Sequence, residues 1–202
     1  MFLGVKWYLW VLLFVVAVLA IFVWIKAISA SKIRREKLKK EAEIWKKDYE
    51  LRQEFKTLSR EKLNATPKNK ILSGICMNIQ IFLEDEADMN EAFLALPDEK
   101  KFIYCLHYFD EDCVKSLSQF FKNNGSPLTD YIIDALKAVN YAEILPDVEL
   151  VQPMYDENSD VSIDYKTIEK TDVRFQEIYS SGKLYDLVSD YVKKNKEIFI
   201  DR

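Results

Sequence analysis

The sequence predicts an all-α protein, and three observations carry this prediction. Apolar residues recur at spacings of three and four along most of the chain, as on one face of an α-helix, and no stretch keeps the strict alternation of a half-buried strand. The 202 residues include only four glycines, which disfavours sheets joined by tight hairpins. Long stretches are rich in Lys, Glu, Arg and Leu, which favour helix even where little packing supports it.

The first expected element is a membrane-spanning helix over residues 7–25, which defines an anchor of residues 1–26. This stretch carries no charge and lies between Lys6 and Lys26. At 1.5 Å per residue it would reach about 28 Å, close to the thickness of a bilayer core. Tryptophans stand near both of its ends, where amphipathic rings favour the membrane interface. The chain is therefore expected to contact a lipid bilayer through residues 7–25.

Basic residues after this apolar stretch set the expected topology. Six Lys and Arg residues lie between Lys32 and Lys40 with only Glu36 in opposition. Such an excess holds its side of a membrane protein in the cytoplasm. The alternative is a secretory signal peptide cleaved near Ala27–Ser29, although its apolar core is usually shorter, about 7–15 residues. We expect a single-pass protein of the cell membrane with its C-terminal domain in the cytoplasm.

Residues 27–66 are expected to form a charged helical stalk. The stretch 33–63 contains no Gly or Pro, and Pro67 should end the helix because it disfavours helical geometry in the residue before it. One apolar stripe consists of Leu38, Ala42, Trp45 and Tyr49, and a second one of Ile44, Leu51 and Leu58. The stripes leave two interpretations open. The stalk either pairs with a second copy as a coiled-coil homodimer or lies as a solvated helix against the globular domain.

Residues 67–202 are expected to form one acidic helical domain. Residues 1–65 carry 14 Lys and Arg against 7 Asp and Glu, whereas residues 66–202 carry 15 against 26, a net charge of −11. A basic stretch beside a membrane suits anionic lipid headgroups. An acidic domain attracts basic proteins and disfavours direct contact with nucleic acid.

Helical periodicity and capping residues predict seven helices in this domain. Acidic residues after a proline indicate a helix start, and Asn or Gly after an apolar stripe indicates a helix end. The expected helices begin near Ile71, Pro97, Asp110, Pro127, Ala142, Thr171 and Lys183. A polar loop is expected over residues 153–170.

Two acidic groups are the candidate partner-binding residues. They are Glu84, Asp85, Glu86 and Asp88, followed by Asp110, Glu111 and Asp112. Both groups permit two interpretations. They form either a docking face for a basic protein or solvated helix ends, since carboxylates at a helix start interact favourably with the helix dipole.

The sequence shows no constellation that predicts catalysis, a metal site or a cofactor. Cys76, Cys105 and Cys113 lack the spacing of a metal motif and are expected to be small buried residues. His107 lies about 200° around a helix from Cys105, which separates the two side chains. Residues 156–167 alternate acidic residues as a calcium loop does, but Val161 and Thr167 occupy the positions that need Gly and Glu. We therefore expect a non-enzymatic protein without a cofactor.

Three blocks of the domain resemble the bacterial DNA-mimic protein family, which consists of small acidic all-helical domains. The blocks are residues 119–125, 135–142 and 191–199, and the matching positions are Gln119, Phe120, Phe121, Asn123, Gly125 and Asn195. The glycine pair that usually precedes the first block is absent, because Val114–Leu117 stands there. The resemblance implies a helical fold and a structural role for these residues, with Asn195 expected to face the turn near Asn123. It also implies that the carboxylates imitate phosphates toward a DNA-binding protein.

These observations predict an interaction protein. In the first hypothesis, a membrane anchor holds the acidic domain at the cytoplasmic face, where it docks or sequesters a basic protein. In the alternative, the chain is a structural component of a membrane envelope complex and acts through its anchor and stalk.

Overall fold

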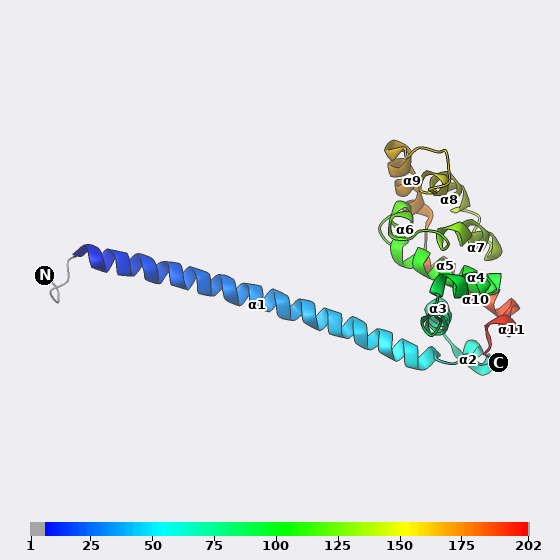
Figure 1. Ribbon diagram of the computed structural model, residues 1–202, viewed down its shortest axis with the longest axis horizontal. Helices are drawn as coiled ribbons and strands as arrows, with labels where there is room; N and C mark the ends of the chain where they lie inside the picture. Colours follow the sequence, from blue (N-terminus) through cyan, green and yellow to red (C-terminus); the bar gives the residue numbers. More distant parts are fainter. Residues whose placement is uncertain (1–6, 202) are drawn as a thin grey trace. The chain divides into compact units, whose positions relative to one another are not determined.

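The computed structural model describes the backbone of residues 7–201 and confirms the all-α prediction for that range (Figure 1). Before Arg34, the described side chains are those of Trp7, Trp10, Val11, Leu12, Phe14, Val15, Trp24, Lys26 and Lys32. The chain divides into two units, residues 1–50 and residues 51–202.

The first unit consists, in its described part, of most of helix α1 (Trp7–Phe55). The predicted anchor and stalk are thus continuous in one helix of 49 residues. A search of the described residues found no helix with both the length and the apolar content that crossing a bilayer requires. The membrane span expected over residues 7–25 gains no support from this search, and many of its side chains lie outside the described residues.

The second unit begins within the last turns of α1, well before the expected domain boundary at residue 67. Phe55 and Leu58 are fully or almost fully buried in the core of the domain, and Leu51 packs against it. Helix α1 ends at Phe55 rather than at the expected position near Leu63. A short helix α2 (Arg60–Ala65) follows, with Ser59 accepting a hydrogen bond from the Lys62 amide at its N-terminus.

The C-terminal residues pack back against this entry segment. The Asp201 amide donates to the Leu58 carbonyl at 3.0 Å, and the Leu58 amide donates to Asp201 Oδ2 at 2.6 Å. The buried Asn78 side chain donates to the carbonyls of Phe55 and Lys56. Residues 55–58 are therefore part of the domain rather than part of a separate stalk.

Helix α5 (Asp98–Cys113) is the centre of the domain (Figure 1). It contacts α3 (Lys68–Glu84), α6 (Leu117–Asn123) and α7 (Ile132–Ala138), and α3 also contacts α10 (Ser181–Lys194). Ile103, Leu106 and Phe109 of α5 are completely buried, as the apolar spacing of this helix predicts. The remaining elements are α4 (Met89–Ala95), η1 (Thr129–Tyr131), α8 (Leu145–Val151), η2 (Gln152–Met154), α9 (Tyr165–Ile178) and α11 (Lys196–Phe199).

Two expected helix starts differ from the structure, and one helix was not expected. The prediction that a helix begins near Asp110 is wrong, because Asp110–Asp112 form the last turn of α5 and the next helix starts at Leu117. Helix α9 begins at Tyr165 instead of Thr171, because Asp164 accepts hydrogen bonds from the Lys166 and Thr167 amides. Helix α4, capped by Asp88, was not expected.

One expected helix end is confirmed at Asn140. This residue has a φ of 62°, in the left-handed region that Asn tolerates. The following Tyr141 amide donates to the Leu136 carbonyl at 2.9 Å, which closes the end of α7. The side chain of Tyr141, the next residue, is completely buried.

Candidate functional site

Glu84, Asp85, Glu86 and Asp88 form an exposed acidic segment between α3 and α4, here called the outer acidic segment. Glu84 pairs with Arg52, and this hydrogen bond lowers the pKa of the Glu84 carboxyl. Asp88 caps α4 by accepting hydrogen bonds from the Asn90 and Glu91 amides at 2.9 and 3.0 Å. Asp85 and Glu86 are exposed at the end of α3, so their carboxylates are accessible to a partner.

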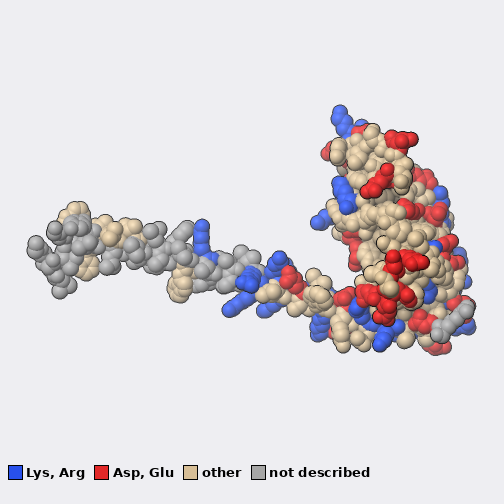
Figure 2. All heavy atoms as spheres, in the orientation of Figure 1, with Lys and Arg blue, Asp and Glu red and all other residues tan. Residues whose placement is uncertain are grey.

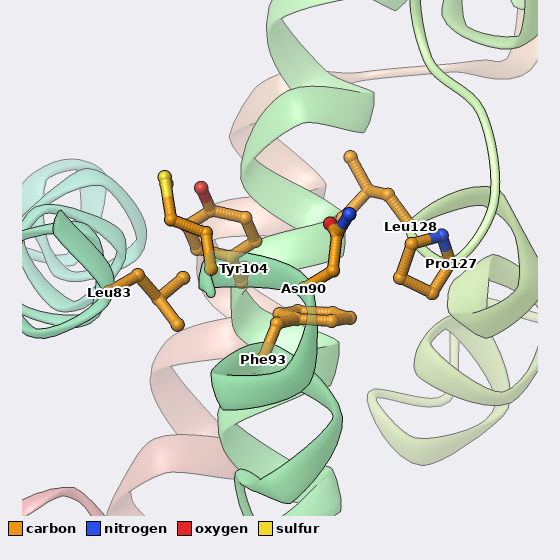
Figure 3. Close-up of a pocket in the computed structure, with 7 residues that line it drawn as sticks. Leu83, Asn90, Phe93, Tyr104, Pro127 and Leu128 are labelled. Atoms are coloured by element: carbon orange, nitrogen blue, oxygen red, sulfur yellow. The ribbon is translucent and has the colours of Figure 1, made fainter. Parts of the chain in front are cut away.

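An apolar pocket lies directly beside this segment (Figure 3). Leu83 from the end of α3 and Met89 from the start of α4 form part of its wall, so the outer acidic segment connects two sides of the pocket. Figure 3 shows the other side chains converging from α4, from α5 and from the loop before η1; they are Asn90, Phe93, Tyr104, Pro127 and Leu128. The cavity has a volume of about 90 Å³.

The size of the pocket suits an aliphatic side chain. It is smaller than the cavities of about 150 Å³ that admit a benzene ring. The Tyr104 hydroxyl lies 3.3 Å from the Tyr108 hydroxyl, and burial raises the pKa of Tyr104.

A larger groove of about 740 Å³ elsewhere on the domain carries charges of both signs, Lys100 with Glu197 and Asp201. In the smaller pocket, the chain segment that joins Leu83 to Met89 carries four acidic residues and no basic one.

Asp110, Glu111 and Asp112, here called the inner acidic group, have a different environment. Asp110 is 8% exposed and accepts hydrogen bonds from the hydroxyls of Tyr179 at 2.5 Å and Tyr185 at 2.7 Å. Burial, reinforced by the neighbouring Asp110 carboxylate, raises the pKa of Tyr179, and the same causes raise that of Tyr185 to about 12. Both phenols therefore stay protonated as donors, and Asp110 is not available to a partner.

The other two members of the inner acidic group also have partners within the domain. Asp112 accepts hydrogen bonds from the side-chain amides of Asn123 at 2.5 Å and Asn124 at 2.6 Å, which ties the end of α5 to the end of α6. Glu111 remains exposed and lies 3.5 Å from His107 Nε2. The structure thus does not combine the two acidic groups into one uniform docking face.

The residues of the family-like pattern have structural roles in the domain. Phe120 and Phe121 are buried, and Phe121 stacks on Tyr155 with ring centroids 5.7 Å apart. Gln119 donates to Asn123 Oδ1 at 2.6 Å. Gly125 follows the end of α6, and its carbonyl accepts hydrogen bonds from the Leu128 and Thr129 amides.

The expected contact between Asn195 and the turn near Asn123 is not formed. Asn195 Nδ2 instead donates to the Tyr191 carbonyl at 3.1 Å, one turn earlier in the chain. Its backbone stands between α10 and α11, where the Asn195 carbonyl accepts a hydrogen bond from the Ile198 amide. Asn195 therefore shapes a local helix junction.

Burial changes the protonation behaviour of the cysteine thiols and of the histidine in this domain. Burial raises the pKa of the thiols of Cys76, Cys105 and Cys113, which keeps them protonated. Burial also lowers the pKa of His107, against the opposing effect of Glu111 and Asp110. Among the described residues, no group of three or more His, Cys, Asp or Glu side chains is arranged to hold a metal ion.

Sequence reasoning missed the apolar pocket, because its walls come from residues 83–128 and no local pattern joins them. The one signal in the sequence is Met89, a large apolar residue that directly follows an acidic run and is 46% exposed. Comparison of the chain with family models, curated proteins and solved structures found no match. The resemblance to the DNA-mimic family stays a prediction.

Proposed function

We propose that this chain is a non-enzymatic interaction protein whose acidic domain docks or sequesters a basic protein. The observation that carries the proposal is the outer acidic segment with the apolar pocket at its side. Figure 2 shows patches of Asp and Glu side chains, with some Lys and Arg, on the visible face of the domain, and residues 66–202 carry a net charge of −11. A field of this sign favours the approach of basic proteins.

The pocket adds a second requirement for the partner. An aliphatic side chain of the partner enters between Met89 and Leu128, while neighbouring Lys or Arg side chains meet Asp85 and Glu86. Apolar burial contributes affinity, and the charges contribute association rate and choice of partner. A basic DNA-binding protein, as the family resemblance implies, is one class of partner with this chemistry.

We further propose that the chain acts at the cytoplasmic face of the cell membrane, to which residues 7–25 anchor it. The support is the exposure of large apolar side chains on this part of α1; those described are Trp7, Trp10, Val11, Leu12, Phe14, Val15 and Trp24. The basic residues that follow are exposed as well, and they suit anionic lipid headgroups. An anchor would keep the domain at high local concentration near a membrane-bound partner.

The charge requirement is tested by capturing partners from native lysate on the full-length chain in mild detergent. Asp85→Lys with Glu86→Lys is compared with Glu157→Lys plus Asp160→Lys, a control that changes the net charge equally at exposed positions of another loop. We expect basic proteins to be retained by the wild type and the control at low salt, and lost by the first variant and at high salt. Equal retention by both variants would contradict the proposed docking site.

The pocket requirement is tested with a matched pair on α4. Met89 and Leu94 are exposed to similar extents, but only Met89 lines the pocket. We expect Met89→Ser to weaken partner binding about fivefold, as the loss of roughly 1 kcal/mol of apolar burial predicts, and Leu94→Ser to leave it unchanged. Equal effects of both substitutions would show that the partner does not use the pocket.

A further inference from the structure

Helix α1 carries an apolar stripe along the first unit, interrupted at Ser31 and Arg35, and this stripe has no role in the proposed docking site. Trp10, Trp24, Leu38 and Trp45 are separated by multiples of seven residues. A second set with the same property is Trp7, Phe14, Ala42 and Tyr49. The two sets are offset by three residues within the seven-residue repeat. The second set therefore occupies the a positions and the first set the d positions of a coiled-coil heptad.

These side chains are exposed along a single continuous helix. Leu38 is 54% exposed, Trp45 75% and Tyr49 64%, and Ala42 is exposed as well. A lone amphipathic helix is marginal in water unless its apolar face packs against something. The apolar stripe is therefore expected to pack against another apolar surface.

The apolar core of a membrane does not contact the C-terminal part of the stripe. Trp45 lies 21 positions after Trp24, which is about 30 Å along the helix axis. A bilayer whose interface holds Trp24 therefore leaves Trp45 and Tyr49 outside its core. Exposed lysines such as Lys39, Lys40 and Lys46 surround this part of the helix and favour water.

We propose that the stripe from Leu38 to Tyr49 pairs with the same stripe of a second copy of this chain, as a parallel two-stranded coiled coil. A face with a and d spacing is complementary to itself, so a symmetric pair buries both copies at once. In a straight helix the stripe drifts by about 20° per heptad, which left-handed supercoiling of the two helices corrects. Ala42 at an a position permits close approach of the two helix backbones.

The flanking charges favour the parallel arrangement. Lys32, Lys39 and Lys46 all occupy the e positions, which would face one another in an antiparallel pair. In a parallel pair, Glu41 at g faces Lys46 at e of the second copy, and symmetry provides this contact twice. In the same arrangement, Arg34 at g faces Lys39 at e of the second copy, which is a like-charged contact. Both side chains are exposed and can turn toward water.

Aromatic side chains contribute the largest contact area of the proposed pair. Between Leu38 and Tyr49 the stripe carries two of them per copy, Trp45 and Tyr49. Each aromatic side chain can bury about 150 Å² or more, so the two copies together bury four such side chains.

The test uses the full-length chain in mild detergent, with cysteines introduced on and off the stripe. The native cysteines are buried, so the introduced thiol is the accessible one. We expect oxidation to link Ala42→Cys into a covalent dimer at least tenfold more efficiently than Glu43→Cys, which lies on another side of the helix. Equal cross-linking at the two positions would overturn the proposal.

A second pair of variants measures the mass of the particle by light scattering. Leu38 lies on the stripe, whereas Ile44 is an aliphatic residue of the same helix that lies off it and is 65% exposed. We expect Leu38→Glu to halve the protein mass of the particle and Ile44→Glu to leave it unchanged. A monomeric wild type, or a Leu38→Glu variant that remains a dimer, would overturn the proposal. Neither result bears on the acidic docking site, which is tested by its own variants.

Discussion

The outer acidic segment and the inner acidic group have similar compositions and different environments. Asp85 and Glu86 lie at the end of α3 with their carboxylates in solvent. Asp110 is buried under two tyrosine hydroxyls, and Asp112 is held by two asparagine amides. The number of carboxylates in a run therefore says little about its use. The donors that the fold brings to each carboxylate decide whether it stabilises the domain or remains available to a partner.

The inner acidic group also stands where helix electrostatics are unfavourable. Three acids occupy the last turn of α5, at the negative end of the helix dipole. The hydrogen bonds that Asp110 and Asp112 accept offset this cost. The following predictions test the difference between the two acidic groups, beginning with the largest expected effect.

Asp110→Ala should lower the free energy of unfolding by about 3 kcal/mol, because it leaves the hydroxyls of Tyr179 and Tyr185 without their acceptor in a buried site. Asp85→Ala, at an exposed position, should change it by less than about 0.5 kcal/mol. Urea denaturation of both variants measures the two values. Similar losses for the two variants would remove the distinction between the groups.

Asp112→Ala should have an intermediate effect, a loss of about 1.5 kcal/mol. The substitution removes the hydrogen bonds from Asn123 and Asn124, and both amides can turn to water because they are not fully buried. The same denaturation measurement applies, with Glu111→Ala as an exposed neighbouring control. A loss as large as that of Asp110→Ala would mean that Asp112 is less accessible than the structure shows.

His107 should make stability depend on pH below neutrality. Burial lowers its pKa in the folded protein, so the unfolded chain binds a proton more readily as the pH falls below about 6.5. The contribution of neutral His107 is complete above that pH and is lost progressively below it. Wild type should therefore lose more stability than His107→Gln between pH 7.5 and pH 5, by less than the Asp112→Ala effect. An identical pH dependence of the two proteins would contradict this assignment.

Asp85→Lys with Glu86→Lys should have the smallest effect on stability, within about 0.5 kcal/mol of wild type. Cations near the end of a helix interact favourably with its dipole, so the substitutions do not weaken α3. Thermal unfolding of this variant and of the wild type checks the prediction. A large loss of stability would mean that the partner-binding test on this variant measures folding rather than docking.

The sequence predicted the fold class and most of the core but not the difference between the acidic groups. Ile71, Ile103, Phe120 and Val188 follow the helical spacing of apolar residues and are buried, because burial of a helix face is a local pattern. The helix start predicted at Asp110 was wrong because acidic residues usually mark a helix start. The tyrosine hydroxyls that donate to Asp110 come from residues about 70 positions later in the chain, which no local pattern reveals.

The boundary of the domain was also beyond local patterns. In the sequence Phe55 stands in a stretch of charged residues, yet its ring fills the space over Gly74, where an added methyl group would lie 2.3 Å from it. The lack of a side chain at Gly74 allows this contact within α3. The apolar pocket has a similar origin, since it forms only when α3, α4, α5 and the loop before η1 meet.

The most direct test of the central claim is chemical labelling of the carboxylates in the native full-length protein, using a carbodiimide and an amine, with mass spectrometry of the modified positions. We predict rapid modification of Asp85 and Glu86, slow modification of Asp112, and none of Asp110 until urea unfolds the domain. Adding a captured basic partner should protect Asp85 and Glu86 selectively. Comparable labelling of Asp110 and Asp85 in the folded protein, or partner protection elsewhere with none at Asp85 and Glu86, would contradict the account.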